Sequence, residues 1–176
     1  YLVSAMTEPP ETINMVGWSR GAVTCLRIAN ALHEVFPQIA VNIFAYDPVA
    51  GGSAGETMSD TQTIAENVRQ YVGILSMHER RGAFSPQDLS RVKISGDASR
   101  VLFLPMPGHH SAQVSKGKAD LSWALSRSLA YTFLRHHGSR AGSGAAAHAG
   151  RDEDHVGPFQ GGAHAVLVLL HGHHAH

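Results

Sequence analysis

The residues of this chain best suited to chemistry lie in the pentad Gly17-Trp18-Ser19-Arg20-Gly21, which has the pattern G-x-S-x-G. An apolar run at 13–16 precedes the pentad, and a helix-forming stretch at 22–34 follows it. This is the setting of a nucleophile elbow, a sharp turn between a strand and a helix that exposes a serine hydroxyl. The N-terminus of such a helix points its partial positive charge at the oxyanion formed by serine attack. The plainer alternative is a glycine-flanked turn in which Ser19 caps the helix.

Serine attack needs a histidine base and an acid that orients it, and both follow Ser19 in the chain. Residues 41–46 read as a buried strand that runs directly into Asp47, and the apolar run at 101–104 leads to His109 and His110. The order Ser19, Asp47, His110 is the order that α/β-hydrolases use, with each residue after its own strand. Asp-Pro is also good turn chemistry, and both histidines fit an ordinary loop. The joint occurrence of the three residues therefore favours a catalytic triad.

Other acids compete with Asp47 for the third position of this triad. They are Asp60, Glu79, Asp88 and Asp97. Many α/β-hydrolases place the acid one strand further along, which favours the later candidates. Asp47 is preferred because it alone directly follows a strongly apolar strand of the kind that would neighbour the elbow strand. The backbone amide of Arg20 is expected to donate to the oxyanion.

Several segments resemble the DUF2235-type α/β-hydrolases, a family that includes phospholipase effectors of bacterial type VI secretion. Residues 16–22 look like the family's elbow, G-x-S-R-G-A, and residues 45–49 sit where the family has a strand ending in an aspartate-containing turn. Residues 78–86 are similar to a family segment of the form D-E-x-R-x-x-F-x-P, with His78 in place of the usual acid. The match covers residues 13 to about 115.

A fourth segment, 107–111, looks like the family pattern P-G-x-H-S and aligns His110, rather than His109, with the catalytic base. Two departures accompany the resemblance. Residues 112–114 replace an acidic, glycine-rich stretch, and only residues 1–12 precede the elbow strand, where family members carry several strands. We therefore expect a domain that is incomplete at its N-terminus and a second oxyanion donor from outside this chain.

The resemblance implies an α/β-hydrolase-like fold, with a mostly parallel sheet and flanking helices. It implies a serine hydrolase that cleaves carboxylic esters, phospholipids among them, through an acyl-enzyme and without a cofactor or metal. The implied partners are a lipid or other ester substrate, a membrane surface as its source, and a secretion-machinery or immunity protein. Two alternatives remain open. One is another serine-dependent esterase, thioesterase or acyltransferase; the other is an inactive hydrolase remnant.

Composition is typical of one folded domain, since 43% of the 176 residues are hydrophobic and 14 basic residues balance 14 acidic ones. No basic cluster extends beyond Arg80-Arg81, which argues against nucleic acid as a partner. The single cysteine, Cys25, excludes an internal disulfide and is expected to be buried as a small apolar residue. No segment reads as a signal peptide or as the roughly 20 apolar residues that span a bilayer. The cytoplasm and secretion as an effector both remain open.

Apolar residues at helical spacing predict three helices. The first follows the pentad and has a wide apolar stripe that ends before Pro37. The second is predicted from Ile64, Val68, Tyr71, Val72 and Leu75, and the third from Leu121, Leu125, Leu129 and Phe133. Residues 51–61 are expected to form either a lid over the site or a plain surface loop.

The chain divides into a catalytic region, 1–137, and a Gly/Ala/His-rich tail, 138–176. Nine of the 13 histidines lie at or after His136, and the composition of 139–162 predicts disorder. The apolar run at 166–170 is either an edge strand or an aggregation-prone segment. The histidines of 171–176 are a weak candidate for a transition-metal site, because no carboxylate or cysteine accompanies them.

Overall fold

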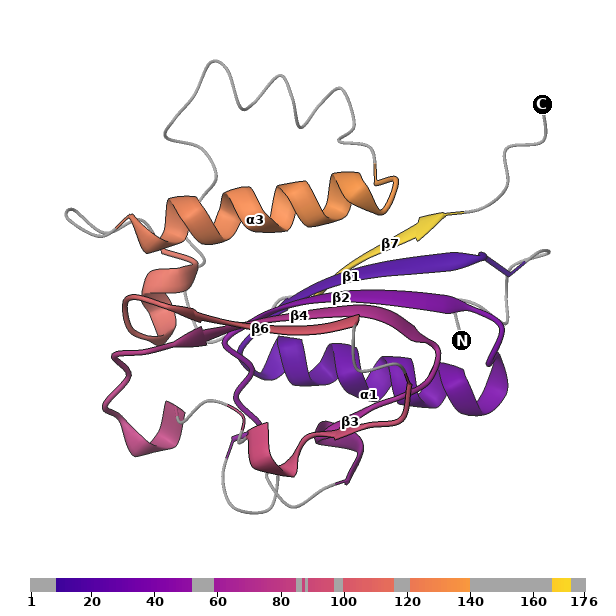
Figure 1. Ribbon diagram of the computed structural model, residues 1–176, viewed down its shortest axis with the longest axis horizontal. Coiled ribbons are helices and arrows are strands. Elements are labelled where there is room, and N and C mark those ends of the chain that lie inside the picture. Colours follow the sequence, from indigo (N-terminus) through magenta and orange to yellow (C-terminus); the bar gives the residue numbers. More distant parts are fainter. Residues whose placement is uncertain are drawn as a thin grey trace.

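The computed structural model describes residues 9–51, 59–84, 87, 89–96, 100–115, 121–139 and 166–171. Its centre is a five-stranded sheet in the order β6-β4-β2-β1-β7, with a long helix on each face (Figure 1). The strands are β1 (Thr12–Trp18), β2 (Ala40–Tyr46), β4 (Val68–Ser76), β6 (Val101–Met106) and β7 (Val166–His171). The first four run parallel, and β7 runs antiparallel to β1. The chain thus has an α/β fold with a mostly parallel sheet, as predicted.

Helix α1 (Arg20–Val35) covers one face of the sheet and helix α3 (Ser122–His136) covers the other (Figure 1). The shorter elements are the paired strands β3 (Thr63–Ile64) and β5 (Lys93–Ile94) and the 3₁₀ helices η2 (Ser59–Thr61), η3 (Gly82–Phe84), η4 (Leu89–Arg91) and η6 (His110–Gln113). Because β1, β2, β4 and β6 are parallel, their carboxyl ends meet at one edge of the sheet. Ser19, Asp47 and the loop to His110 all leave from that edge.

The four parallel strands send alternate side chains to two separate cores. On the α1 face, Ile13 and Met15 of β1 pack in a cluster with Leu26 of α1. On the α3 face, Phe44 and Phe133 belong to a second cluster, and their rings are 5.5 Å apart. The stripe predicted for α1 is confirmed, since its inward residues are buried, and so is the burial of Cys25. The two cores clamp the central strands and thereby fix where their carboxyl ends lie.

The helix predicted from Ile64 to Leu75 is wrong, because 68–76 forms strand β4, which lies between β2 and β6 in the sheet. This strand is buried on both faces, with Tyr71 in the α1 core and Val72 in the α3 core. A strand covered on both sides reads as a continuous apolar run, which also satisfies helical spacing over a short window. The β-branched and aromatic residues of the segment favour a strand.

The helix predicted around Leu129 is confirmed as α3, but the face predicted to be buried is only partly correct. Leu121 and Leu125 are 77% and 51% exposed, while Ser126 and Ala130 are buried. The hydroxyl of Ser126 donates to Gln113 Oε1 over 2.8 Å. Small side chains thus face the sheet where α3 approaches Tyr46, and further along the helix Phe133, which was predicted to be buried, packs against Phe44.

The predicted tail contributes the edge strand β7, so the first of the two alternatives for 166–170 is confirmed. The predicted disorder of 139–162 lies outside the described residues from position 140 onward. The histidine cluster from 172 onward and the candidate lid at 52–58 also lie outside them. No helix within the described ranges is long and apolar enough to cross a bilayer.

Candidate active site

Ser19 occupies the turn between β1 and α1, with φ 57° and ψ −125°. A positive φ is rare for a residue with a side chain, so the turn is strained as an elbow requires. The Ser19 amide donates to the Tyr46 carbonyl over 2.9 Å, which ties the turn to the end of β2. The Ser19 side chain makes no capping hydrogen bond, so the alternative of a helix-capping serine is wrong. Arg20 begins α1, and its amide is one of the first-turn groups without an intrahelical acceptor.

Gly17 allows the elbow to close. A Cβ at this position would lie 2.5 Å from the Gly21 carbonyl oxygen and 2.6 Å from the Ala22 nitrogen. Both atoms belong to the backbone of α1 and cannot move without displacing the helix. The first glycine of the pentad is therefore required by the close approach of α1 to the end of β1.

Asp47 and His110 form a buried pair. His110 Nδ1 lies 2.7 Å from Asp47 Oδ2, and the two side chains are 2% and 0% exposed. The second carboxylate oxygen of Asp47 accepts a hydrogen bond from the Ser76 amide over 2.8 Å. An ionised carboxylate can only accept, so an ionised Asp47 takes its hydrogen bond from the Nδ1–H of His110, and Nε2 of a neutral ring is then an acceptor.

The other imidazole nitrogen of His110, Nε2, is buried and has no hydrogen-bond partner. Two aromatic rings hold the imidazole: Trp18 stacks on it at 5.1 Å and 27°, and Phe84 packs at 5.2 Å and 45°. Trp18 directly precedes Ser19, so the imidazole lies beside the elbow. A buried nitrogen without a partner costs about 1–3 kcal/mol. Since Nε2 has no partner, the structure places Ser19 beside the imidazole without a hydrogen bond between Ser19 Oγ and His110.

The residues that competed with His110 and Asp47 for places in the triad have other partners or lie outside the described residues. His109 is exposed and pairs with Ser111 Oγ over 3.0 Å, whereas His110 is buried. Asp60 forms an ion pair with Arg27 on α1, and Glu79 contacts the backbone of His110 rather than its ring. Asp88 and Asp97 lie outside the described residues.

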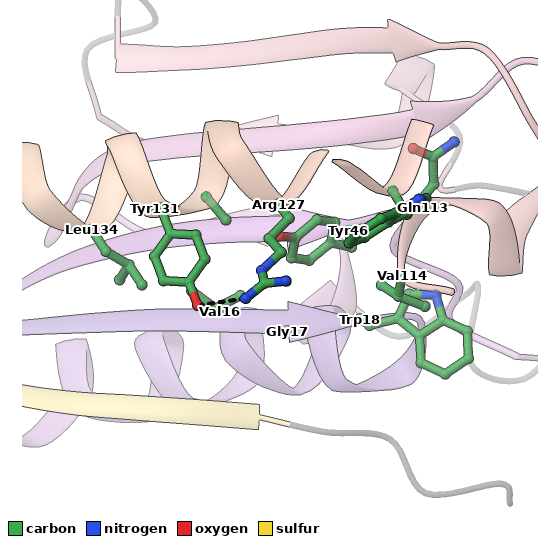
Figure 2. A pocket seen from close by; sticks show the side chains of 11 residues that line it. Val16, Gly17, Trp18, Tyr46, Gln113, Val114, Arg127, Tyr131 and Leu134 are labelled. Carbon is green, nitrogen blue, oxygen red and sulfur yellow. Dashed lines mark hydrogen bonds between the residues drawn. The ribbon is translucent and has the colours of Figure 1, made fainter. Parts of the chain in front are cut away.

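A cavity of about 330 Å³ lies between α3 and the carboxyl half of β1 (Figure 2). Its lining is mostly apolar and comes from β1, β2, α3 and the residues around η6: Val16, Gly17, Trp18, Tyr46, Gln113, Val114, Trp123, Arg127, Ala130, Tyr131 and Leu134. Figure 2 shows Arg127 and Tyr131 reaching from α3, 3.4 Å apart between Nη2 and Oη. Trp18 lies between the cavity and the candidate site, because it lines the cavity and also stacks on His110.

Sequence reasoning missed the roles of Trp18, Phe84 and Glu79 around His110. Trp18 lies inside the pentad, and Phe84 and Glu79 lie in the 78–86 segment. Their places in these two motifs were the only signal in the sequence that they could contact the base. Within the parts of the chain that the structure describes, no group of three or more histidine, cysteine or carboxylate side chains could hold a metal ion.

No protein-family model matches this chain, and no curated protein matches its sequence. The resemblance to the DUF2235-type hydrolases therefore stays a prediction that rests on four short segments.

Proposed function

We propose that this chain is a serine hydrolase of the α/β-hydrolase type that cleaves carboxylic esters by a Ser19-His110-Asp47 triad. The observation that carries the proposal is the buried Asp47–His110 pair beside a strained serine elbow, with Nε2 of His110 unpartnered. Ser19 attacks the ester carbonyl, and His110 accepts its proton at Nε2 and later gives it to the leaving alcohol. Asp47 holds the imidazole tautomer and stabilises the imidazolium. Water then hydrolyses the acyl-enzyme.

The tetrahedral intermediate carries its negative charge next to the N-terminus of α1. The amide of Arg20 donates to this oxyanion, and the dipole of α1 adds to its stabilisation. Loss of one oxyanion donor in enzymes of this kind lowers the rate by about 10²–10³-fold.

The substrate we propose has a hydrocarbon part, as lipid and phospholipid esters do. The support is the mostly apolar cavity whose wall includes Trp18, the residue that precedes Ser19 in the chain. The resemblance to phospholipase effectors points to the same substrate class. A membrane as the source of substrate, and a secretion-machinery or immunity partner, follow from that resemblance alone.

The experiment that tests the nucleophile is labelling with a fluorophosphonate probe. We expect stoichiometric modification of Ser19, located by peptide mass spectrometry, and its loss in Ser19→Ala. The control is Ser128→Ala, which removes an exposed hydroxyl from α3 and should label like the wild type. Labelling that persists in Ser19→Ala would contradict the nucleophile, and a folded wild type that never labels would favour an inactive remnant.

Turnover of matched oxygen esters, thioesters and phospholipid vesicles separates the proposed esterase activity from thioesterase and acyltransferase activity. We expect kcat/KM to be higher for oxygen esters than for thioesters of the same acyl chain. Faster transfer of the acyl group to an added alcohol than to water would instead identify an acyltransferase.

A further inference from the structure

The segment that follows β4 wraps around the loop that carries His110. The His78 amide donates to the Gly108 carbonyl over 3.1 Å, and the Gly108 amide donates back to His78 Nδ1 over 3.0 Å. The Met77 amide donates to the Met106 carbonyl over 3.0 Å. These bonds continue the pairing of β4 with β6 beyond the ends of both strands, so residues 77–78 follow the loop toward its histidine.

Glu79 then holds the backbone of His110 directly. Its Oε2 accepts a hydrogen bond from the His110 amide over 3.1 Å. Its Oε1 accepts from the amides of Arg80 and Arg81 over 3.0 and 2.8 Å. The Glu79 side chain is only 3% exposed, while that of its partner Arg81 is half exposed.

Arg81 fixes Glu79 in this position with two parallel side-chain bonds. Arg81 Nε lies 2.9 Å from Oε1, and Nη2 lies 2.8 Å from Oε2. This bidentate geometry is specific to a guanidinium and a carboxylate. Side-chain hydrogen bonds from Arg81 hold the pKa of Glu79 well below its usual range, so the carboxylate stays ionised at working pH.

The same arginine reaches His110 by a second route. Its guanidinium lies 4.2 Å from the centre of the Phe84 ring, and that ring packs against the His110 imidazole at 5.2 Å. Glu79 thus sets the backbone of His110, while Arg81 and Phe84 set its ring against Trp18 on the elbow. Glu79, Arg81 and Phe84 together therefore contact both the backbone of His110 and its imidazole ring.

We propose that Glu79 is a positioning residue that holds His110 between Asp47 and Ser19, with Arg81 and Phe84 as its support. The inference rests on the proposed function in that His110 is taken as the base. Glu79 is not the acid of the triad, because its carboxylate meets the amide of His110 and not the ring.

The test compares Glu79→Ala and Glu79→Gln with Glu66→Ala, an exposed carboxylate that serves as the control. Misplacing a base by about 1 Å costs on the order of 100-fold. We therefore expect kcat, and the rate of fluorophosphonate reaction at Ser19, to fall by about 100-fold in Glu79→Ala with KM unchanged. Glu79→Gln keeps an acceptor oxygen but loses the second bond to Arg81, so its loss should be intermediate. Glu66→Ala should match the wild type.

A proton NMR signal of the His110 Nδ1–H, bonded to Asp47, gives a readout that needs no turnover. We expect this downfield signal to shift or broaden in Glu79→Ala and in Arg81→Lys, and to stay unchanged in Glu66→Ala. Should Glu79→Ala not fold, Glu79→Gln and Arg81→Lys carry the same test. Folded variants with wild-type rates and an unchanged signal would overturn the positioning role while leaving the triad intact. A wild type that reacts with no probe would instead overturn the proposed function, and the NMR signal would still decide on Glu79.

Discussion

Two residues of the candidate site hold backbone conformations that side chains rarely permit, Ser19 with φ 57° and Asp47 with φ 42°. Each directly follows a strand, and each is held by a hydrogen bond to the next strand in the sheet. The Ser19 amide bonds to the Tyr46 carbonyl over 2.9 Å, and the Asp47 amide bonds to the Ile74 carbonyl over 2.8 Å. Such conformations cost about 1–3 kcal/mol each and persist where surrounding structure enforces them. Here the sheet supplies that constraint, and both strained residues belong to the proposed triad.

Asp47→Asn tests the acid at this scale. Asparagine keeps the shape and the oxygen that accepts from the Ser76 amide, but it no longer fixes the proton on His110 Nδ1. We expect kcat to fall by about four orders of magnitude, with the fold and the site of fluorophosphonate labelling retained. Ester turnover and a thermal melt measure the two effects. Near wild-type turnover, together with collapse in Asp88→Asn or Asp97→Asn, would assign the acid to a later residue.

At the scale of elements, α3 decides the shape of the cavity. Its buried side chains toward the sheet are Ser122, Ser126, Ala130 and Phe133, most of them small. Tyr46 donates through its hydroxyl to the Ser126 carbonyl over 3.2 Å, so helix and sheet lie close at that point. Burial raises the pKa of Tyr46 beyond its usual range and keeps this hydroxyl a donor. The cavity occupies the space beside this contact.

Ala130→Leu tests whether the cavity receives the hydrocarbon part of the substrate. The larger side chain fills part of the space, so kcat/KM for long-chain esters should fall by about tenfold or more while acetyl esters are unaffected. Ser128→Leu adds the same side chain to the exposed face of α3 and is the matched control. An equal loss for long and short esters would contradict this role, since overpacking alone affects all substrates alike.

At the scale of the whole molecule, Cys25 reports on the integrity of the fold. The thiol lies in the core between α1 and the sheet, and burial raises its pKa to about 12. A thiol reagent needs the thiolate, so reaction requires that the core opens.

We expect Cys25 of the native protein to be unreactive toward a disulfide reagent at pH 8. In denaturant, Cys25 should form a mixed disulfide and displace one equivalent of the reagent's thiol. The rate of labelling should rise with denaturant in parallel with unfolding followed by circular dichroism. Rapid stoichiometric labelling of native protein would show that α1 separates from the sheet locally.

Sequence patterns predicted α1, which has one buried face, and the fully buried strand β2, but they mistook β4 for a helix. The stripe of α1 and the strand before Asp47 are local patterns, and both are confirmed. β4 was mistaken for a helix because a strand covered on both faces loses its alternation. The orientation of α3 was only partly predicted, since which face packs depends on how closely the helix approaches the sheet.

The sequence by itself determined the strained turn at Ser19 and the need for Gly17, because backbone sterics act over a few neighbouring residues. It also placed Asp47 at the end of its strand. Only the tertiary structure brought Asp47 to His110, left His109 exposed, and joined Glu79 to the amide of His110. These contacts join residues 31 to 63 positions apart. They depend on the strand order and on the path of the loop after β6, which no local pattern of residues encodes.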